Sequence, residues 1–145
     1  MSHMLGHFVS EGIGMRHLID YYYVLKKLHE DGVKEEFSSI FSHLGLFSFS
    51  RGVMWIENKI LGLDEKKIIT PISEGAGRII FNSMMAGGNF GFYRAENIIR
   101  KKSIFKRGLI DAYRMIKIVP VQPSEVFYRL KHKICNVESM KQIVM

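Results

Sequence analysis

The sequence predicts an all-α protein, a bundle of five or six helices, and two observations carry this prediction. First, apolar residues recur at steps of three and four along much of the chain, which places them on one face of an α-helix. Second, glycines follow several of these periodic segments, at the position where helices commonly end. Alternation of apolar and polar residues is nowhere sustained, and only residues 67–70 suggest a brief strand pairing.

The first half of the chain contains four predicted helices. The first three are each followed by a glycine: 15–30 by Gly32, 34–44 by Gly45, and 49–61 by Gly62. Ser48 or Ser50 is the expected N-cap of the third, because a hydroxyl can accept an unpaired amide hydrogen there. A connector follows, and Ser73 with Glu74 then predicts a fourth helix that runs to about residue 85.

The second half is also predicted to be helical. The glycine-rich run at 86–91 ends the fourth helix, and a long basic amphipathic helix is expected over 94–117. Pro120 and Pro123 end that helix, because proline cannot donate the backbone hydrogen bond. A last helix is expected over 124–137.

Aromatic and methionine side chains are predicted to fill the core. Trp55 is expected there together with four phenylalanines, Phe37, Phe41, Phe47 and Phe49. Met54, Met84 and Met85 are expected to fill gaps, because the unbranched thioether side chain adapts to irregular spaces. The apolar stripe predicted for the first helix consists of Met15, Leu18, Ile19, Tyr22 and Leu25.

Length and composition fit one globular domain. The 145 residues are 47% hydrophobic and 24% charged, and no apolar run approaches the roughly 20 residues of a membrane helix. A single cysteine, Cys135, permits no internal disulfide, so a cytoplasmic location is predicted. Residues 1–4 are interpreted as a cloning remnant in front of a single helical domain at 5–145.

Positive charge is concentrated in the second half. Residues 1–87 hold nine Lys and Arg against ten Asp and Glu, whereas residues 88–145 hold twelve against four, a balance of +8. The densest basic segment comprises Arg100, Lys101, Lys102, Lys106 and Arg107. These residues are either a solvated helix face or contacts to a nucleic-acid backbone, an anionic membrane surface or an acidic partner. No base-reading motif accompanies them.

The segment from His7 to Asp20 combines two glycines with polar side chains at the start of a helix. Arg16 and Asp20 are four residues apart and share a helix face, where they form either a solvated ion pair or a binding site. In the second case Arg16 binds phosphate oxygens with its planar guanidinium and Asp20 orients a substrate group.

His7 and Glu11 are also four residues apart and could form a metal or proton-transfer pair. Alternatively, Glu11 caps the helix that follows and His7 only packs. No third ligand stands at helical spacing, since His3 lies in the residues set aside at the N-terminus and His17 lies on a flank of the next helix. We therefore predict no metal site.

A glycine-rich element stands at Gly88, Asn89, Phe90 and Gly91. It is interpreted either as a tight turn anchored by Phe90 or as a loop whose amides bind a ligand. It lacks the spacing and the Lys-Ser/Thr ending of known phosphate loops.

Taken in order, these elements resemble the C-terminal region of the bacterial uncharacterised nucleotidyltransferase family. The resemblance rests on four segments: the His7–Asp20 element, the helix at 46–62, the Gly88–Gly91 element, and the Pro-Ser-Glu element at 123–125. It implies a helical module that helps to position nucleotide or acceptor. Arg16 and Asp20, and then His7 and Glu11, are the implied contact residues.

The chain departs from that family in one respect that bears on activity. It has no Asp-x-Asp, Glu-x-Asp or Asp-x-Glu pair, the arrangement that places two carboxylates on one face of a strand to hold metal ions. The resemblance therefore implies that Mg²⁺, nucleoside triphosphate and the acids that bind them belong to an N-terminal catalytic domain outside this chain. We expect this chain alone to be inactive. A non-enzymatic interaction module that uses the basic half, and a helical scaffold without ligand, are the alternatives.

Overall fold

The computed structural model describes residues 1–10, 12–33, 36–87, 116, 118–121, 123 and 127. Within these residues the protein is entirely helical and has no strand, so the all-α prediction is confirmed and the brief pairing suggested at 67–70 is not found. The elements are α1 (Ser2–Ser10), α2 (Met15–Glu30), α3 (Phe37–His43), α4 (Phe47–Lys59), the 3₁₀ turn η1 (Glu65–Lys67) and α5 (Glu74–Gly87).

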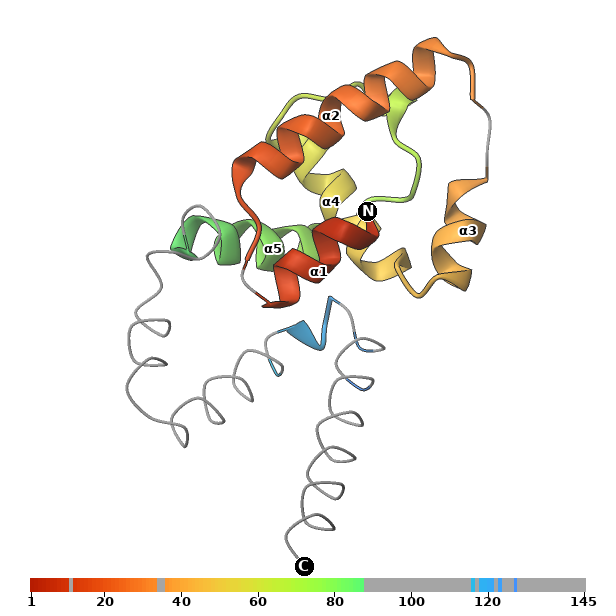
Figure 1. Ribbon diagram of the computed structural model, residues 1–145. Helices are drawn as coiled ribbons and strands as arrows, with labels where there is room; N and C mark the ends of the chain where they lie inside the picture. Colours follow the sequence, from red (N-terminus) through yellow and green to blue (C-terminus); the bar gives the residue numbers. More distant parts are fainter. Residues whose placement is uncertain are drawn as a thin grey trace, which may run out of the picture.

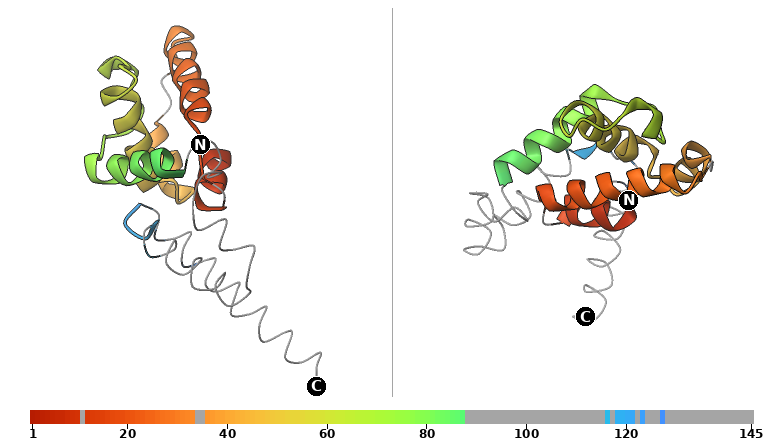
Figure 2. Two further views of the ribbon diagram at one scale, coloured as in Figure 1. Left: turned by 90° about the vertical axis from the view of Figure 1, so that its left-hand side faces the viewer. Right: turned by 90° about the horizontal axis from the view of Figure 1, so that it is seen from above.

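Helix α4 forms the centre of the hydrophobic core. Its side chains Phe49, Val53, Met54 and Ile56 are completely buried. It packs along α5 over the longest helix contact, and it also touches α2 and α3. Figure 1 and the two further views in Figure 2 show these helices gathered into one body with α3 at its edge.

The contact between α4 and α5 depends on two small residues. A Cβ atom at Gly52 would lie 2.7 Å from Cδ1 of Ile80 and 2.9 Å from the backbone carbon of Ala76. A Cβ atom at Gly77 would lie 2.7 Å from Cδ2 of Trp55. Both glycines therefore let the two helices approach more closely than any larger side chain permits.

Helix boundaries follow the predictions in most places. The first predicted helix matches α2, and the three closing glycines all have positive φ: 67° at Gly32, 66° at Gly45 and 73° at Gly62. The predicted N-cap of α4 is wrong, since the helix begins at Phe47 and the hydroxyl of Ser50 instead donates to the Phe47 carbonyl at 2.8 Å.

Helix α3 is shorter than the predicted segment 34–44, because it begins only at Phe37. Helix α5 begins as expected directly after Ser73, whose carbonyl accepts a hydrogen bond from the amide of Gly77 at 2.9 Å. These differences shift helix ends and leave the order of the helices unchanged.

The predicted core is confirmed in its centre and wrong at its edges. Phe41, Phe49, Met54 and Met84 are buried as expected, and the half-buried side chains are Phe37, Phe47 and Trp55. Met85 is 62% exposed, because it follows Met84 on the helix and is rotated by about 100° from the buried face. Its assignment to the core was wrong.

Helix α1 was not predicted. Residues 2–4 lie within it, and the side chain of Met4 is buried together with those of Leu5 and Phe8. The interpretation of residues 1–4 as a cloning remnant stays a prediction, since burial of Met4 does not bear on the origin of these residues. The assignment of a domain to 5–145, as part of a larger protein, stays a prediction.

The helices predicted at 94–117 and 124–137 lie mostly outside the described residues. None of the described helices combines the length and apolar character that crossing a membrane requires.

Candidate functional site

The turn between α1 and α2 fixes where the candidate site residues lie. The amide of Gly12 donates to the carbonyl of His7 at 2.7 Å and closes the end of α1. Gly12 has a φ of 106°, a backbone conformation that favours glycine because it has no Cβ. The next residue, Ile13, is buried, so the turn is anchored in the core directly before α2 begins.

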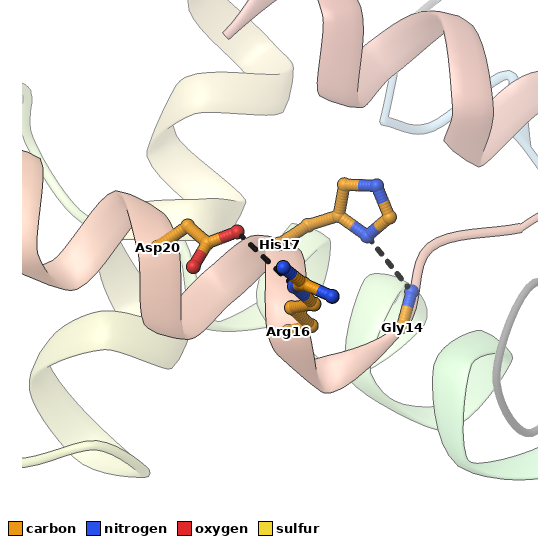
Figure 3. A network of polar contacts seen from close by, with 4 residues as sticks. All are labelled: Gly14, Arg16, His17 and Asp20. Atoms are coloured by element: carbon orange, nitrogen blue, oxygen red, sulfur yellow. Dashed lines mark hydrogen bonds and ion pairs between the residues drawn. The ribbon is translucent and has the colours of Figure 1, made fainter.

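Arg16 and Asp20 lie on the solvent side of α2, as their spacing predicts. Nε of Arg16 is 3.9 Å from a carboxylate oxygen of Asp20, and the two side chains are 87% and 69% exposed (Figure 3). An ion pair with this exposure contributes at most about 0.5 kcal/mol to stability. Both side chains are therefore open to an incoming ligand, and neither is needed for folding.

Apolar side chains flank this pair. Met15 is 36% exposed, Ile19 42% and Tyr23 63%, and their spacing of four residues makes a stripe beside Arg16 and Asp20. We call these five residues the α2 outer face. Of the apolar stripe predicted for this helix, Leu18 and Leu25 are buried as expected, whereas Met15 and Ile19 are partly exposed, so their assignment to the core was wrong.

Three histidines gather on the other flank of the same turn. The rings of His3 and His7 on α1 are in edge contact, with centroids 4.5 Å apart, and His17 on α2 lies 5.4 Å from His7. One nitrogen from each of the three lies within 4.8 Å of the others. Sequence reasoning considered each histidine and did not bring them together, because the spacing between α1 and α2 depends on an unpredicted helix.

The N-terminus of α2 has no side-chain cap at Gly14. Its amide donates to Nδ1 of His17 over a long distance of 3.4 Å (Figure 3). Glu11, the predicted cap, lies outside the described residues, so its capping role stays a prediction.

A buried carboxyl group was missed entirely at the sequence level. Glu57 on α4 is completely buried, and neither of its side-chain oxygens has a hydrogen-bond partner among the described residues. Burial raises the pKa of Glu57 to about 8, because the charged form loses its hydration. The pKa of Tyr21 on α2 is also raised, first by its own burial and second by the negative charge of Glu57.

Two hollows in the described surface lie away from these residues. One of about 480 Å³ is lined by Ser38, Glu65 and residues 68–72. A second of about 190 Å³ lies between the C-terminal half of α2 and η1. Neither of these two hollows is lined by Arg16, Asp20 or the three histidines His3, His7 and His17.

The structure thus brings Arg16 and Asp20 together and places His7 beside two other histidines. The remaining predicted site residues lie outside the described part of the chain: Glu11, Gly88, Asn89, Gly91, Arg100, Lys101, Lys102, Lys106 and Arg107. Comparison with known proteins adds no relative, since no family model, curated protein or solved structure matches this chain.

Proposed function

We propose that this chain is a helical C-terminal module of a nucleotidyltransferase-like protein and that its α2 outer face helps to position nucleotide or acceptor. The observation that carries the proposal is the exposed pair of Arg16 and Asp20 on the first turns of α2. A guanidinium open to solvent can bind two phosphate oxygens at once, and the neighbouring carboxylate can orient a hydroxyl or an amine.

The exposed apolar stripe of the α2 outer face supports the same proposal. Met15, Ile19 and Tyr23 lie in contact with water although a partner surface could cover them. A catalytic domain outside this chain would bury the stripe and place its bound nucleotide next to Arg16. An open surface would then become one wall of a closed site.

In this proposal the chain holds neither Mg²⁺ nor the whole of a nucleoside triphosphate. Both belong to the catalytic domain in the cytoplasm, and the chain alone transfers no nucleotidyl group. His7 is positioned near the same turn and remains a secondary candidate, because its ring lies against two other histidines.

The alternative is a non-enzymatic module that binds nucleic acid or an acidic partner through the basic half. Its support is the charge balance of +8 in residues 88–145. The salt dependence of binding separates the two functions. Binding to a nucleic-acid backbone weakens steeply with salt and ignores nucleotide identity, whereas a nucleotide site discriminates among nucleotides.

Replacing Arg16 with alanine is expected to weaken nucleoside triphosphate binding by about 10- to 100-fold, the range for a lost hydrogen bond to a charged group. Calorimetry with each of the four nucleoside triphosphates, with and without Mg²⁺, measures the change. The fold is expected to be unaffected, since the side chain of Arg16 is 87% exposed and its ion pair with Asp20 lies at the surface.

Arg78→Ala is the matched control, because Arg78 is also exposed and pairs with Glu74 four residues away, at 2.8 Å. This variant is expected to bind nucleotide as the unaltered chain does. Equal affinity of the Arg16 variant and the unaltered chain would contradict the proposal.

A further inference from the structure

The group formed by His3, His7 and His17 has the composition of a transition-metal site. Three neutral imidazoles are the protein ligands of several zinc sites, in which a fourth position stays open to water or substrate. Here His3 is exposed and the other two are half-buried, so the cluster has one side toward solvent and one toward the protein.

The fold holds the two helices that carry these rings. His3 and His7 are one helical turn apart on α1, which puts their side chains on the same face. His17 is in the first turn of α2, and the turn that joins the two helices is closed by the hydrogen bond from the Gly12 amide to the His7 carbonyl at 2.7 Å. Buried residues on both helices, Phe8 and Leu18, fix this arrangement in the core.

We propose that His3, His7 and His17 bind one Zn²⁺ ion with three imidazole nitrogens and a water molecule as the fourth ligand. The ion would link α1 to α2 directly beside the α2 outer face. This proposal does not rest on the proposed nucleotide function, because none of the three ligands is Arg16 or Asp20.

The geometry needs only a modest adjustment to accept the ion. Tetrahedral zinc with Zn–N bonds of about 2.0–2.1 Å places its nitrogens about 3.3 Å apart. The three nitrogens already lie within 4.8 Å of one another, so rotations about the side-chain bonds can close the difference. One contact that a bound ion would replace is the hydrogen bond from the Gly14 amide to Nδ1 of His17, and its length of 3.4 Å makes it weak.

Zinc binding can be measured on the full chain without a histidine tag, after removal of metal by a chelator. Titration with Zn²⁺ against a zinc-binding dye gives the stoichiometry and affinity. Titration with Co²⁺ reports the coordination through its visible absorption. We expect one ion per chain and a tetrahedral Co²⁺ spectrum.

Glutamine substitutions at each of the three positions are expected to weaken zinc binding by on the order of 100-fold or more, since even outer-shell changes cost 10- to 100-fold. His3→Gln keeps the test valid if another variant unfolds, because His3 is exposed. Circular dichroism of each variant checks the fold.

Two exposed histidines outside the cluster provide matched controls. His29→Gln and His43→Gln are expected to leave zinc affinity unchanged. Three results would overturn the proposal: no binding of micromolar Zn²⁺, equal binding by the three cluster variants, or equal losses in the control variants. Loss of nucleotide binding in the Arg16 variant with zinc binding intact would show that the two sites are independent.

Discussion

Replacing Glu57 with glutamine is expected to remove a strong pH dependence from the stability of the protein. The pKa of Glu57 is raised from 4.5 to about 8 in the folded state. Below pH 4.5 the carboxyl group of Glu57 is protonated in the folded and in the unfolded state, so it adds no pH dependence to the stability. Between pH 4.5 and 8 only the folded state keeps the proton, so stability falls as pH rises. Above pH 8 Glu57 is ionised in both states, so it no longer makes the stability depend on pH.

The size of the effect follows from the pKa difference. Between the two pKa values, the free energy of unfolding falls by about 1.4 kcal/mol for each pH unit. Ionisation of Glu57 in the unfolded state therefore lowers the stability at pH 7 by on the order of 3 kcal/mol. The stability of Glu57→Gln relative to the unaltered chain should therefore rise by about that amount between pH 4.5 and pH 7. Urea denaturation at a series of pH values measures this difference.

Glu74→Gln is the matched control for the glutamate substitution. Glu74 is exposed and pairs with Arg78 on the surface of α5, so its loss is expected to cost less than about 1 kcal/mol at any pH. A stability difference for Glu57→Gln that stays constant from pH 4.5 to pH 8 would show that Glu57 is not a buried, protonated acid.

Replacing Gly52 with alanine is expected to destabilise the protein by about 1–3 kcal/mol, and valine by more, because either side chain overpacks the core. The new Cβ would meet Cδ1 of Ile80 at 2.7 Å and the backbone of Ala76 at 2.9 Å. A side chain can rotate away, but the backbone of α5 can yield only if the whole helix shifts. Denaturant unfolding of the variant measures the loss.

Gly75→Ala is the matched control for Gly52→Ala, because it makes the same change in helix propensity without a steric clash. A Cβ at Gly75 meets nothing within 4 Å, so this substitution on α5 should stabilise the protein by about 0.5–1 kcal/mol. The two substitutions are chemically identical and are expected to have opposite signs. If Gly52→Ala were as stabilising as Gly75→Ala, α4 and α5 would not pack as closely as described.

Much of the fold could be predicted because periodicity and helix-ending glycines are local signals. Helix α2 and the position of Gly32 were both predicted from spacing alone. Helix α1 was missed because its first residues were set aside, and the exposure of Met15 and Ile19 was missed because spacing does not show which neighbours cover a helix.

The candidate site was only partly predictable for the same physical reason. The Arg16–Asp20 pair lies within one helix, so its sequence spacing determined its geometry. The histidine cluster joins two helices, and no spacing rule relates His7 to His17 across a turn. The spacing of His3 and His7 was the available signal. No signal in the sequence pointed to Glu57, since its burial depends on the helices packed around α4.

The proposed function requires that nucleotide contacts the start of α2. Amide NMR spectra of the chain, recorded with increasing concentrations of ATP and Mg²⁺, test it residue by residue. We expect shifts concentrated at residues 12–20 that disappear in the Arg16→Ala variant. Shifts concentrated at residues 100–107 instead, or shifts unaffected by this substitution, would contradict it and favour binding through the basic half.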